Sequence, residues 1–289
     1  MYPAPPPMLP PNPAIDTLID LALAEDLGCL DVTAAALIPP GTAAVFELQA
    51  REALVFCGAP VVDRLLWRLG PGAPVARWNA HEGQAVAAGG VVGTVVGDQH
   101  LLLQTERVIL NFLQRMSGVA TLTARYVAAV AGTGARIVDT RKTLPGWRAL
   151  DKYAVRCGGA LNHRFALDGG VLIKDNHLAA AGGVAAAVAK ARAFAPHPLR
   201  IEVEVEDLAG VDAALAAGAE VILLDNFSPE RLRVAAERIG SRAIIEASGG
   251  VNLSTVRAFA EAGAQLIAVG ALTHSAVAVD LAAEVVPVG

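Results

Sequence analysis

Residues 200–271 contain four short β-rich runs, RIEVEV (200–205), VILLDN (221–226), AIIEASG (243–249) and LIAVGA (266–271). Their first residues lie 21 to 23 positions apart, and an alanine-rich stretch with helical spacing fills each gap. Short strands alternating with helices at this interval are typical of βα units around a parallel sheet. The pattern therefore predicts an α/β domain.

Two further runs, RIVDT (136–140) and GVLIK (170–174), extend the repeat toward the N-terminus. A complete eight-stranded barrel needs about 250 residues, whereas the repeating part occupies only residues 118–274. We therefore expect residues 118–274 to form an incomplete parallel (βα) barrel of six or seven strands. An open doubly wound sheet is the alternative topology.

The first hundred residues have a different pattern, which predicts an N-terminal α+β sandwich domain over residues 14–117. The expected elements are a helix over 14–25, a strand over 45–57, a helix over 61–69 and a hairpin over 81–98.

The two ends of the chain are assigned separately. Residues 1–13 are rich in proline, which favours an extended, disordered tail. Residues 275–289 follow the last repeat, and we expect this C-terminal segment to pack back on the N-terminal domain.

Composition excludes several classes of protein. The chain has 289 residues, of which 54% are hydrophobic, and its formal net charge is −5. Such a chain is not mainly disordered, and it has no overall positive field for nucleic acid or an anionic membrane. Its three cysteines, Cys29, Cys57 and Cys157, form no C-x-x-C pair. They predict neither a disulfide framework nor a zinc site, and they favour a reducing cytoplasm.

The segment HEGQAVAAGGVVGTVVGD (81–98) resembles the hairpin of biotinyl and lipoyl carrier domains. Those domains carry their cofactor on a lysine at the tight turn, and here the turn residues 87–90 are Ala-Ala-Gly-Gly. A carrier or anion-binding module is therefore kept only as a non-enzymatic alternative.

A strongly apolar helix is expected over residues 100–116, with one polar stripe formed by Gln104, Arg107, Asn111 and Gln114. Such a stripe must face water, a partner or a ligand.

Polar or glycine residues end all six predicted strands of the repeat. In parallel α/β folds the site lies beyond the carboxyl ends of the strands, so these positions are the candidates for chemistry. They are Asp139, Thr140, Arg141 and Lys142; Lys174, Asp175, Asn176 and His177; Glu202 and Glu204; Asp225 and Asn226; Glu246, Ser248, Gly249 and Gly250; Val269, Gly270 and Ala271.

The charges of this region predict anionic substrates. Between residues 141 and 174 the cations are Arg141, Lys142, Arg148, Lys152, Arg156, Arg164 and Lys174, against Asp151 and Asp168. Clustered cations of this kind are suited to phosphates or carboxylates. Glu204 and Asp225, on adjacent strands, are suited to ribose hydroxyls or to Mg²⁺ bound to phosphate oxygens. The turns at 248–250 and 269–271, the former just before a helix, are suited to a phosphate. A pocket for a phosphorylated sugar and an anionic second substrate is expected.

The motifs of the chain resemble those of the quinolinate phosphoribosyltransferase (carboxylating nicotinate-nucleotide pyrophosphorylase) family over nearly the whole length. They are LALAEDLG with D-x-T at 31–33, TERVILNFLQRMSGVATLT, DTRKTLPGWRALDKYAVRCGGALNHR, LIKDNH, IEVEVE, LLDN, EASGG and VGALTHS. Three departures from the family pattern are Leu30, Ala160 and the pair Asp168-Gly169.

The resemblance implies a reaction in which quinolinate and phosphoribosyl pyrophosphate give nicotinate mononucleotide, pyrophosphate and CO₂, with Mg²⁺, in cytoplasmic NAD biosynthesis. It implies that quinolinate binds Arg107, Arg141, His163 and Arg164, and that Lys142 and Lys174 serve both substrates. Arg107 would reach the site of a neighbouring subunit in a homodimer or a hexamer of dimers.

The resemblance also assigns the other substrate. It places the 5′-phosphate at Ser248–Gly250 and Val269–Ala271, adds Thr140 and His274 to the binding residues, and assigns Lys142, Lys174, Glu204 and Asp225 to catalysis. Glu204 and Asp225 would hold Mg²⁺ directly or through phosphoribosyl pyrophosphate. A molybdenum-locus homologue of the same fold is the alternative, although the intact KDNH run at 174–177 favours the quinolinate enzyme.

Overall fold

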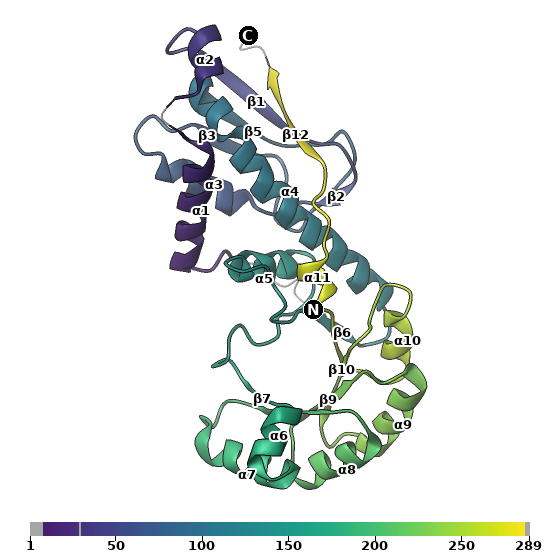
Figure 1. Cartoon of the computed structure of the whole chain (residues 1–289). Helices are drawn as coiled ribbons and strands as arrows, with labels where there is room; N and C mark the ends of the chain where they lie inside the picture. Colours follow the sequence, from purple (N-terminus) through teal and green to yellow (C-terminus); the bar gives the residue numbers. More distant parts are fainter. Residues whose placement is uncertain (1–7, 29, 287–289) are drawn as a thin grey trace. The chain divides into compact units, whose positions relative to one another are not determined.

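A computed structural model of the chain describes residues 8–28 and 30–286 (Figure 1). Contacts divide the described chain into two compact units. The first comprises residues up to 124, residues 143–159 and residues from 272 onward, and the second comprises residues 125–142 and 160–271. The expected domain boundary at 117/118 and the division of the two units after residue 124 both lie inside helix α4 (Gln99–Ala129).

An antiparallel sheet forms the centre of the first unit, with strand order β12-β1-β5-β3. The strands are β1 (Ala43–Ala50), β3 (Val75–Trp78), β5 (Val91–Asp98) and β12 (Leu281–Val286). In β1 every second side chain is buried, including Phe46 and Leu48, because successive residues of a strand point to opposite faces. The C-terminal segment thus supplies an edge strand of this sheet.

Two expectations for this unit are corrected. The strand expected over 45–57 is interrupted, because the chain bends after Ala50 and resumes as β2 (Leu54–Val55). The segment 81–98 is not a hairpin, since β4 (Ala85–Val86) pairs with β2 whereas β5 pairs with β1 and β3. Local alternation of valine and glycine indicates extended chain but does not specify its partner strand.

Helix α1 (Pro13–Asp26) begins one residue earlier than expected. The side chain of Asn12 accepts a hydrogen bond from the N–H of Ala14, and proline occupies the first turn, where its missing N–H costs nothing. Residues 1–7 of the predicted tail lie outside the described residues. Helix α2 (Val32–Leu37) is capped by Asp31, and α3 (Ala59–Arg68) follows Gly58.

Helix α4 is much longer than the expected helix over 100–116, because its small residues do not end it. The hydroxyl of Ser117 donates to the carbonyl oxygen of Cys57, and a β-carbon on Gly118 would lie 2.2 Å from the carbonyl oxygen of Val277. These residues allow close packing at the middle of a continuous helix. Cys57 and Cys157 are buried free thiols, whereas Cys29 lies outside the described residues.

Helix α5 (Arg148–Cys157) belongs to the first unit, although its sequence lies inside the expected barrel domain. It carries Arg148, Lys152 and Arg156 of the predicted cation cluster. These three residues therefore belong to the first unit, whereas Arg141, Lys142, Arg164 and Lys174 belong to the second.

A parallel six-stranded sheet forms the second unit, with strand order β6-β11-β10-β9-β8-β7. The strands are β6 (Arg136–Val138), β7 (Val171–Ile173), β8 (Ile201–Val205), β9 (Val221–Asp225), β10 (Ile244–Ser248) and β11 (Leu266–Ala268). A single parallel bridge between Val138 and Leu161 continues the sheet beyond β6. The expected incomplete (βα) barrel is confirmed.

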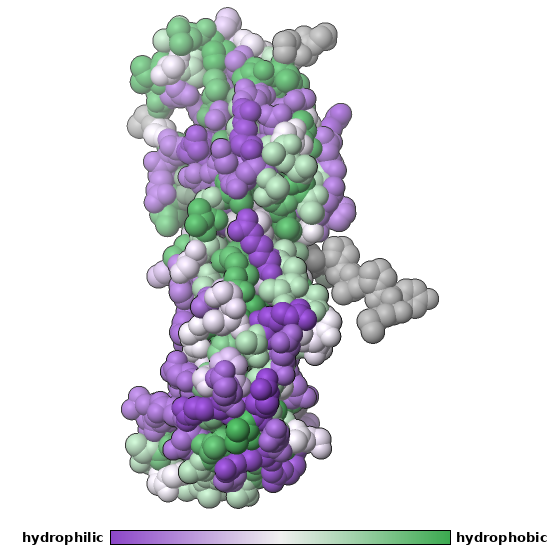
Figure 2. Space-filling model, turned by 90° about the vertical axis from the view of Figure 1, so that its right-hand side faces the viewer, coloured by the Kyte–Doolittle hydropathy of each residue, from purple (hydrophilic) through white to green (hydrophobic). Residues whose placement is uncertain are grey.

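Helices follow the strands of the barrel, namely α6 (Asp175–Ala181), α7 (Val184–Phe194), α8 (Leu208–Ala216), α9 (Pro229–Ile239), α10 (Val256–Glu261) and α11 (Ala271–His274). Figure 1 shows α7 to α9 along the outer side of the curved sheet. Asp207 and Ser228 cap α8 and α9 by accepting backbone N–H bonds. Hydrophilic residues predominate on the part of this unit that Figure 2 shows. Among the described helices, none has the length and apolar character needed to cross a bilayer.

Candidate active site

The carboxyl ends of the barrel strands surround a cavity of about 230 Å³ within the second unit. It is lined by Thr140, Arg141, Lys142, His163, Arg164, Leu172, Lys174, Glu204, Leu223, Asp225, Glu246, Ser248 and Ala268. Nine of these residues were predicted site residues, although their sequence positions span more than a hundred residues. The fold therefore brings the predicted cations and carboxylates into one cavity.

Four cationic side chains line this cavity: Arg141, Lys142, Arg164 and Lys174. One N–H of the Arg164 guanidinium donates to the carbonyl oxygen of Gly170 at 3.0 Å. Burial and the nearby charge of Arg141 lower the pKa of Arg164, whereas Glu202 raises it. Two guanidinium groups in such proximity repel each other, and a bound anion would relieve that repulsion.

Two carboxylates, Glu204 and Asp225, come from the adjacent strands β8 and β9. The Lys174 ammonium forms an ion pair with Oε2 of Glu204. Oδ2 of Asp225 accepts a hydrogen bond of 2.8 Å from the side-chain amide of Asn226. Carboxylate oxygens at one cavity wall are the donor type that Mg²⁺ prefers, so this pair fits the expected ion.

Asp139 fixes the segment that carries His163 and Arg164, a function that the sequence did not reveal. Its buried carboxylate accepts bonds from the Asn162 side-chain amide at 2.6 Å and from the backbone N–H of His163 at 2.8 Å. A carboxylate that follows a buried strand directly is the signal that could have indicated such an anchor.

The His163 imidazole faces two carboxylates below the cavity. Its Nδ1 accepts the backbone N–H of Arg164 at 2.7 Å, so the ring proton of the neutral form is on Nε2. Nε2 lies 3.2 Å from Oε2 of Glu202 and 3.6 Å from Oε1 of Glu246. In this arrangement His163 offers a hydrogen-bond donor between two acids, and its binding of quinolinate stays a prediction.

Glu202 and Glu246 were among the candidate positions at strand ends, but neither was assigned to a substrate or to catalysis. Glu246 is 2% exposed and lines the cavity. Burial and the neighbouring Glu202 raise the pKa of Glu246 to about 8, against a lowering effect of His163. Glutamates alternating with valine in a buried strand such as IEVEV (201–205) are the signal for such inward-facing acids.

The glycine turns lie at the ends of β10 and β11. Gly249 and Gly250 have positive φ angles of 90° and 64°, which favour glycine. The helix expected directly after them begins only at Val256, because a turn anchored by the Asn252 side chain intervenes. Ser248 lines the cavity, whereas Val269, Gly270 and Ala271 follow β11 outside its described lining.

Two predicted binding residues belong to the first unit. Arg107 is exposed on α4, and His274 ends α11 with Nδ1 2.7 Å from the hydroxyl of Ser275. Of the same polar stripe as Arg107, Gln114 donates to the carbonyl oxygen of Leu281. The functions of Arg107 and His274 stay predictions.

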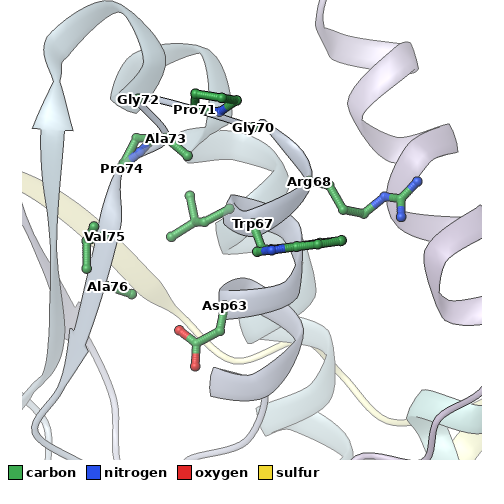
Figure 3. A pocket seen from close by; sticks show the side chains of 11 residues that line it. Asp63, Trp67, Arg68, Gly70, Pro71, Gly72, Ala73, Pro74, Val75 and Ala76 are labelled. Atoms are coloured by element: carbon green, nitrogen blue, oxygen red, sulfur yellow. The ribbon is translucent and has the colours of Figure 1, made fainter.

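A larger hollow, of about 800 Å³, lies in the first unit between α3 and β3. In Figure 3 Asp63 points toward Val75 and Ala76, whereas Arg68 points away from the hollow toward a neighbouring helix. Arg68 forms an ion pair with Asp20 of α1. None of the predicted site residues is among those that line this hollow in the described chain.

Comparisons with known proteins match both parts of the chain to one enzyme family. The N-terminal domain family of quinolinate phosphoribosyl transferase matches residues 31–117, and the C-terminal domain family matches residues 119–284. The chain is 44% identical to a carboxylating nicotinate-nucleotide pyrophosphorylase of Mycobacterium leprae, over 90% of this chain and 93% of the relative. It is 38% identical to the human enzyme of that name, over 97% and 96% of the two chains.

Solved structures give the same result. The nicotinate-nucleotide pyrophosphorylase of Francisella tularensis superposes with a TM-score of 0.91 at 36% identity, covering 96% of this chain and 97% of that chain. Both domains, the sequence identity and the fold thus agree over nearly the full length, and the chain belongs to the quinolinate phosphoribosyltransferase family.

Proposed function

We propose that this chain is a decarboxylating phosphoribosyltransferase that converts quinolinate and phosphoribosyl pyrophosphate into nicotinate mononucleotide, pyrophosphate and CO₂ in NAD biosynthesis. The observation that carries the proposal is the single cavity lined by Arg141, Lys142, Arg164 and Lys174 together with Glu204 and Asp225. It combines sites for two anionic substrates with carboxylates for a ribose. Family membership supports the same reaction.

Quinolinate carries two adjacent carboxylates, which require several fixed donors. Arg141 and Arg164 supply guanidinium groups on one side of the cavity, and Lys142 adds a third positive charge. Arg141 and Arg164 repel each other in the free protein, and a bound dianion relieves this repulsion. The relief contributes to the free energy of binding. These residues orient the pyridine nitrogen toward the sugar.

Lys174, Glu204 and Asp225 serve phosphoribosyl pyrophosphate. The Glu204 and Asp225 carboxylates accept bonds from ribose hydroxyls and stabilise positive charge at the anomeric carbon as pyrophosphate leaves. Glu204 and Asp225 would hold Mg²⁺, directly or through the substrate, and the ion would neutralise charge on the departing pyrophosphate. The Ser248–Gly250 and Val269–Ala271 turns offer backbone N–H groups to the 5′-phosphate. Thr140 and His274 complete the proposed binding residues.

The chemistry then proceeds in two stages. The pyridine nitrogen captures the anomeric carbon as pyrophosphate leaves, and the quaternised nitrogen withdraws electrons from the ring. The carboxylate next to that nitrogen is lost as CO₂. The protein contributes orientation and electrostatics, and no side chain acts as a nucleophile.

The assembly and location of the enzyme also belong to the proposal. Arg107, exposed on α4, would enter the cavity of a second copy in a homodimer, or in a hexamer built of dimers. The buried free thiols of Cys57 and Cys157 are compatible with a reducing cytoplasm.

The direct test measures release of CO₂ from carboxyl-labelled quinolinate by the purified chain. We expect release only with phosphoribosyl pyrophosphate and Mg²⁺ together, and no comparable turnover of nicotinate. Absence of release under these conditions would contradict the proposal. It is the result expected of a homologue of the same fold that acts on another substrate.

A further inference from the structure

Loss of CO₂ leaves a chemical requirement that the mechanism above does not meet. When the bond between C2 of the ring and its carboxylate breaks, the electron pair stays on C2, beside the positively charged nitrogen. Nicotinate mononucleotide carries hydrogen at this carbon, so one proton must be delivered to C2. The group that delivers this proton is a question only if the proposed function holds, and its assignment rests on that function.

Glu246 lies in the wall of the cavity, where it can donate a proton to a bound substrate. It lies in the middle of β10, and it is a lining residue of the cavity together with Arg141 and Arg164. One carboxylate oxygen of Glu246, one of Glu202 and one ring nitrogen of His163 lie within 4.8 Å of one another. Glu246 is therefore the one acid of this cluster that lines the cavity along with the substrate-binding cations.

Hydrogen bonding shows which of the two acids lacks a donor. Because Nδ1 of His163 accepts a hydrogen bond, the N–H that the ring offers is on Nε2, which lies within hydrogen-bond distance of Oε2 of Glu202 at 3.2 Å but 3.6 Å from Oε1 of Glu246. Among the described residues, Oε1 of Glu202 and Oε1 of Glu246 both have no hydrogen-bond partner, so the donor at Oε2 of Glu202 is what distinguishes the two acids. A buried carboxylate without a donor is costly, whereas the protonated acid avoids the buried charge.

The charges that face Glu246 act in opposite directions, since Glu202 raises its pKa and His163 lowers it, and burial is the largest cause of the shift. Two titratable groups change the pKa of Glu246: Glu202 on β8 and His163 on the segment after Leu161. The neighbouring Arg164 is also charged, and burial lowers its pKa whereas Glu202 raises it. Burial and Glu202 together raise the pKa of Glu246 to about 8. At neutral pH the carboxyl is therefore mostly protonated.

We infer that the carboxyl group of Glu246 is the general acid that protonates C2 of the ring after CO₂ leaves. The O–H bond of Glu246 breaks and its proton forms the new C–H bond with the electron pair on C2. The resulting carboxylate takes up a proton from water before the next turnover. Glu202 acts as a positioning residue for the proton, because its negative charge disfavours the ionised form of Glu246.

Substitution of Glu246 by glutamine keeps the shape of the side chain and removes its acidic proton. In wild-type protein at saturating substrates we expect kcat to decline as the pH rises through about 8. In E246Q we expect that decline to disappear and kcat at neutral pH to fall by about 10²-fold, a typical contribution of a general acid. KM for quinolinate should change little, because Glu246 is not a carboxylate-binding group.

The hydrogen at C2 of the product identifies the donor directly. Product formed in an equal mixture of H₂O and D₂O has a deuterium content that depends on the donating group. We expect the ratio of deuterium to hydrogen at C2, measured by mass spectrometry, to differ between wild type and E246Q. An unchanged ratio together with a retained decline near the same pH would overturn the inference, while normal CO₂ release by the wild type would leave the proposed function intact.

Two further variants complete the test. E202Q removes the negative charge that raises the pKa of Glu246, so the decline in kcat should move to lower pH, and an unmoved decline would contradict the inference even if E246Q did not fold. E261Q, at an exposed site paired with Arg257, is the matched control and should keep the wild-type pH profile.

Discussion

Gly249 approaches Asn226 so closely that a β-carbon on residue 249 would lie 2.2 Å from Oδ1 of Asn226. Both residues have positive φ, 90° for Gly249 and 54° for Asn226, and the backbone N–H of Asn226 donates to the carbonyl oxygen of Ser248. The ends of β9 and β10 are thus locked together at the proposed phosphate-binding turn.

Gly249→Ala should therefore lower the free energy of unfolding by about 1–3 kcal/mol and raise KM for phosphoribosyl pyrophosphate. Gly240→Ala is the matched control, because Gly240 has a φ of 56° but no heavy atom within 4 Å of its β-carbon position. Chemical denaturation and steady-state kinetics measure the two effects. Equal losses of stability in both variants would show that backbone strain accounts for the whole effect at residue 249 and that the close approach to Asn226 adds nothing.

Arg141→Ala and Lys174→Ala should each abolish turnover and leave the fold intact. Both side chains line the cavity from strand ends, and the Lys174 side chain is 44% exposed, so neither supports the core. Circular dichroism and CO₂ release provide the measurements. Arg233→Ala, at an exposed position of α9, should keep full activity, and wild-type activity in either cavity variant would refute its assignment.

Quinolinate should raise the melting temperature of the protein more than nicotinate does, because its second carboxylate meets further cations of the cavity. The difference should shrink as ionic strength rises, since salt screens charges that are partly open to solvent. Differential scanning fluorimetry at low and high salt measures both trends. Equal stabilisation by the two acids at low salt would contradict the proposed dianion site.

The stability of the protein should depend on pH through Glu246. Its pKa in the folded chain is raised from 4.5 to about 8, so between these values the folded state holds a proton that the unfolded state has lost. The contribution of Glu246 to the free energy of unfolding therefore falls as the pH rises from 4.5 to about 8, by at most about 1.4 kcal/mol per pH unit. Relative to wild type, E246Q should gain stability over this range. A constant difference in urea denaturation would contradict the raised pKa.

Glu82→Ala should destabilise the first unit. The Glu82 carboxylate accepts the backbone N–H groups of Gly58 and Ala59 at 2.9 Å, at the start of α3, and the thiol of Cys157 at 3.4 Å. Loss of these bonds should cost about 1–3 kcal/mol in thermal or chemical unfolding. Glu82→Gln keeps an acceptor oxygen and should cost less, and equal costs would assign the effect to packing.

The sequence predicted the barrel well, because each of its strands pairs with parallel neighbours at a regular interval. Thr140, Arg141, Lys174, Glu204 and Asp225 could be placed in one cavity for the same reason, since parallel strands end at one edge of a sheet. Strand pairing in the first unit was harder to predict. The partners of β2 and β5 depend on contacts distant in the chain, and the pattern over 81–98 does not encode them.

The state of His163 and Glu246 could not be predicted from residue types. Which ring nitrogen of His163 can donate depends on the hydrogen bond that Nδ1 makes, and here Nδ1 accepts the backbone N–H of Arg164. The proton on Glu246 depends on its distance from Glu202 and on burial at the middle of β10. Such properties follow from three-dimensional proximity and have no local sequence signal.

Strand β12 pairs with β1 along six residues, from Val45 to Ala50, although it comes after every other element in chain order. During synthesis on the ribosome, the edge of β1 that pairs with β12 therefore stays unpaired until the whole barrel has been translated. The barrel is free to form first, and the N-terminal sheet is completed only after residues 281–286 leave the exit tunnel. An unpaired strand edge over that interval is a natural binding site for a chaperone.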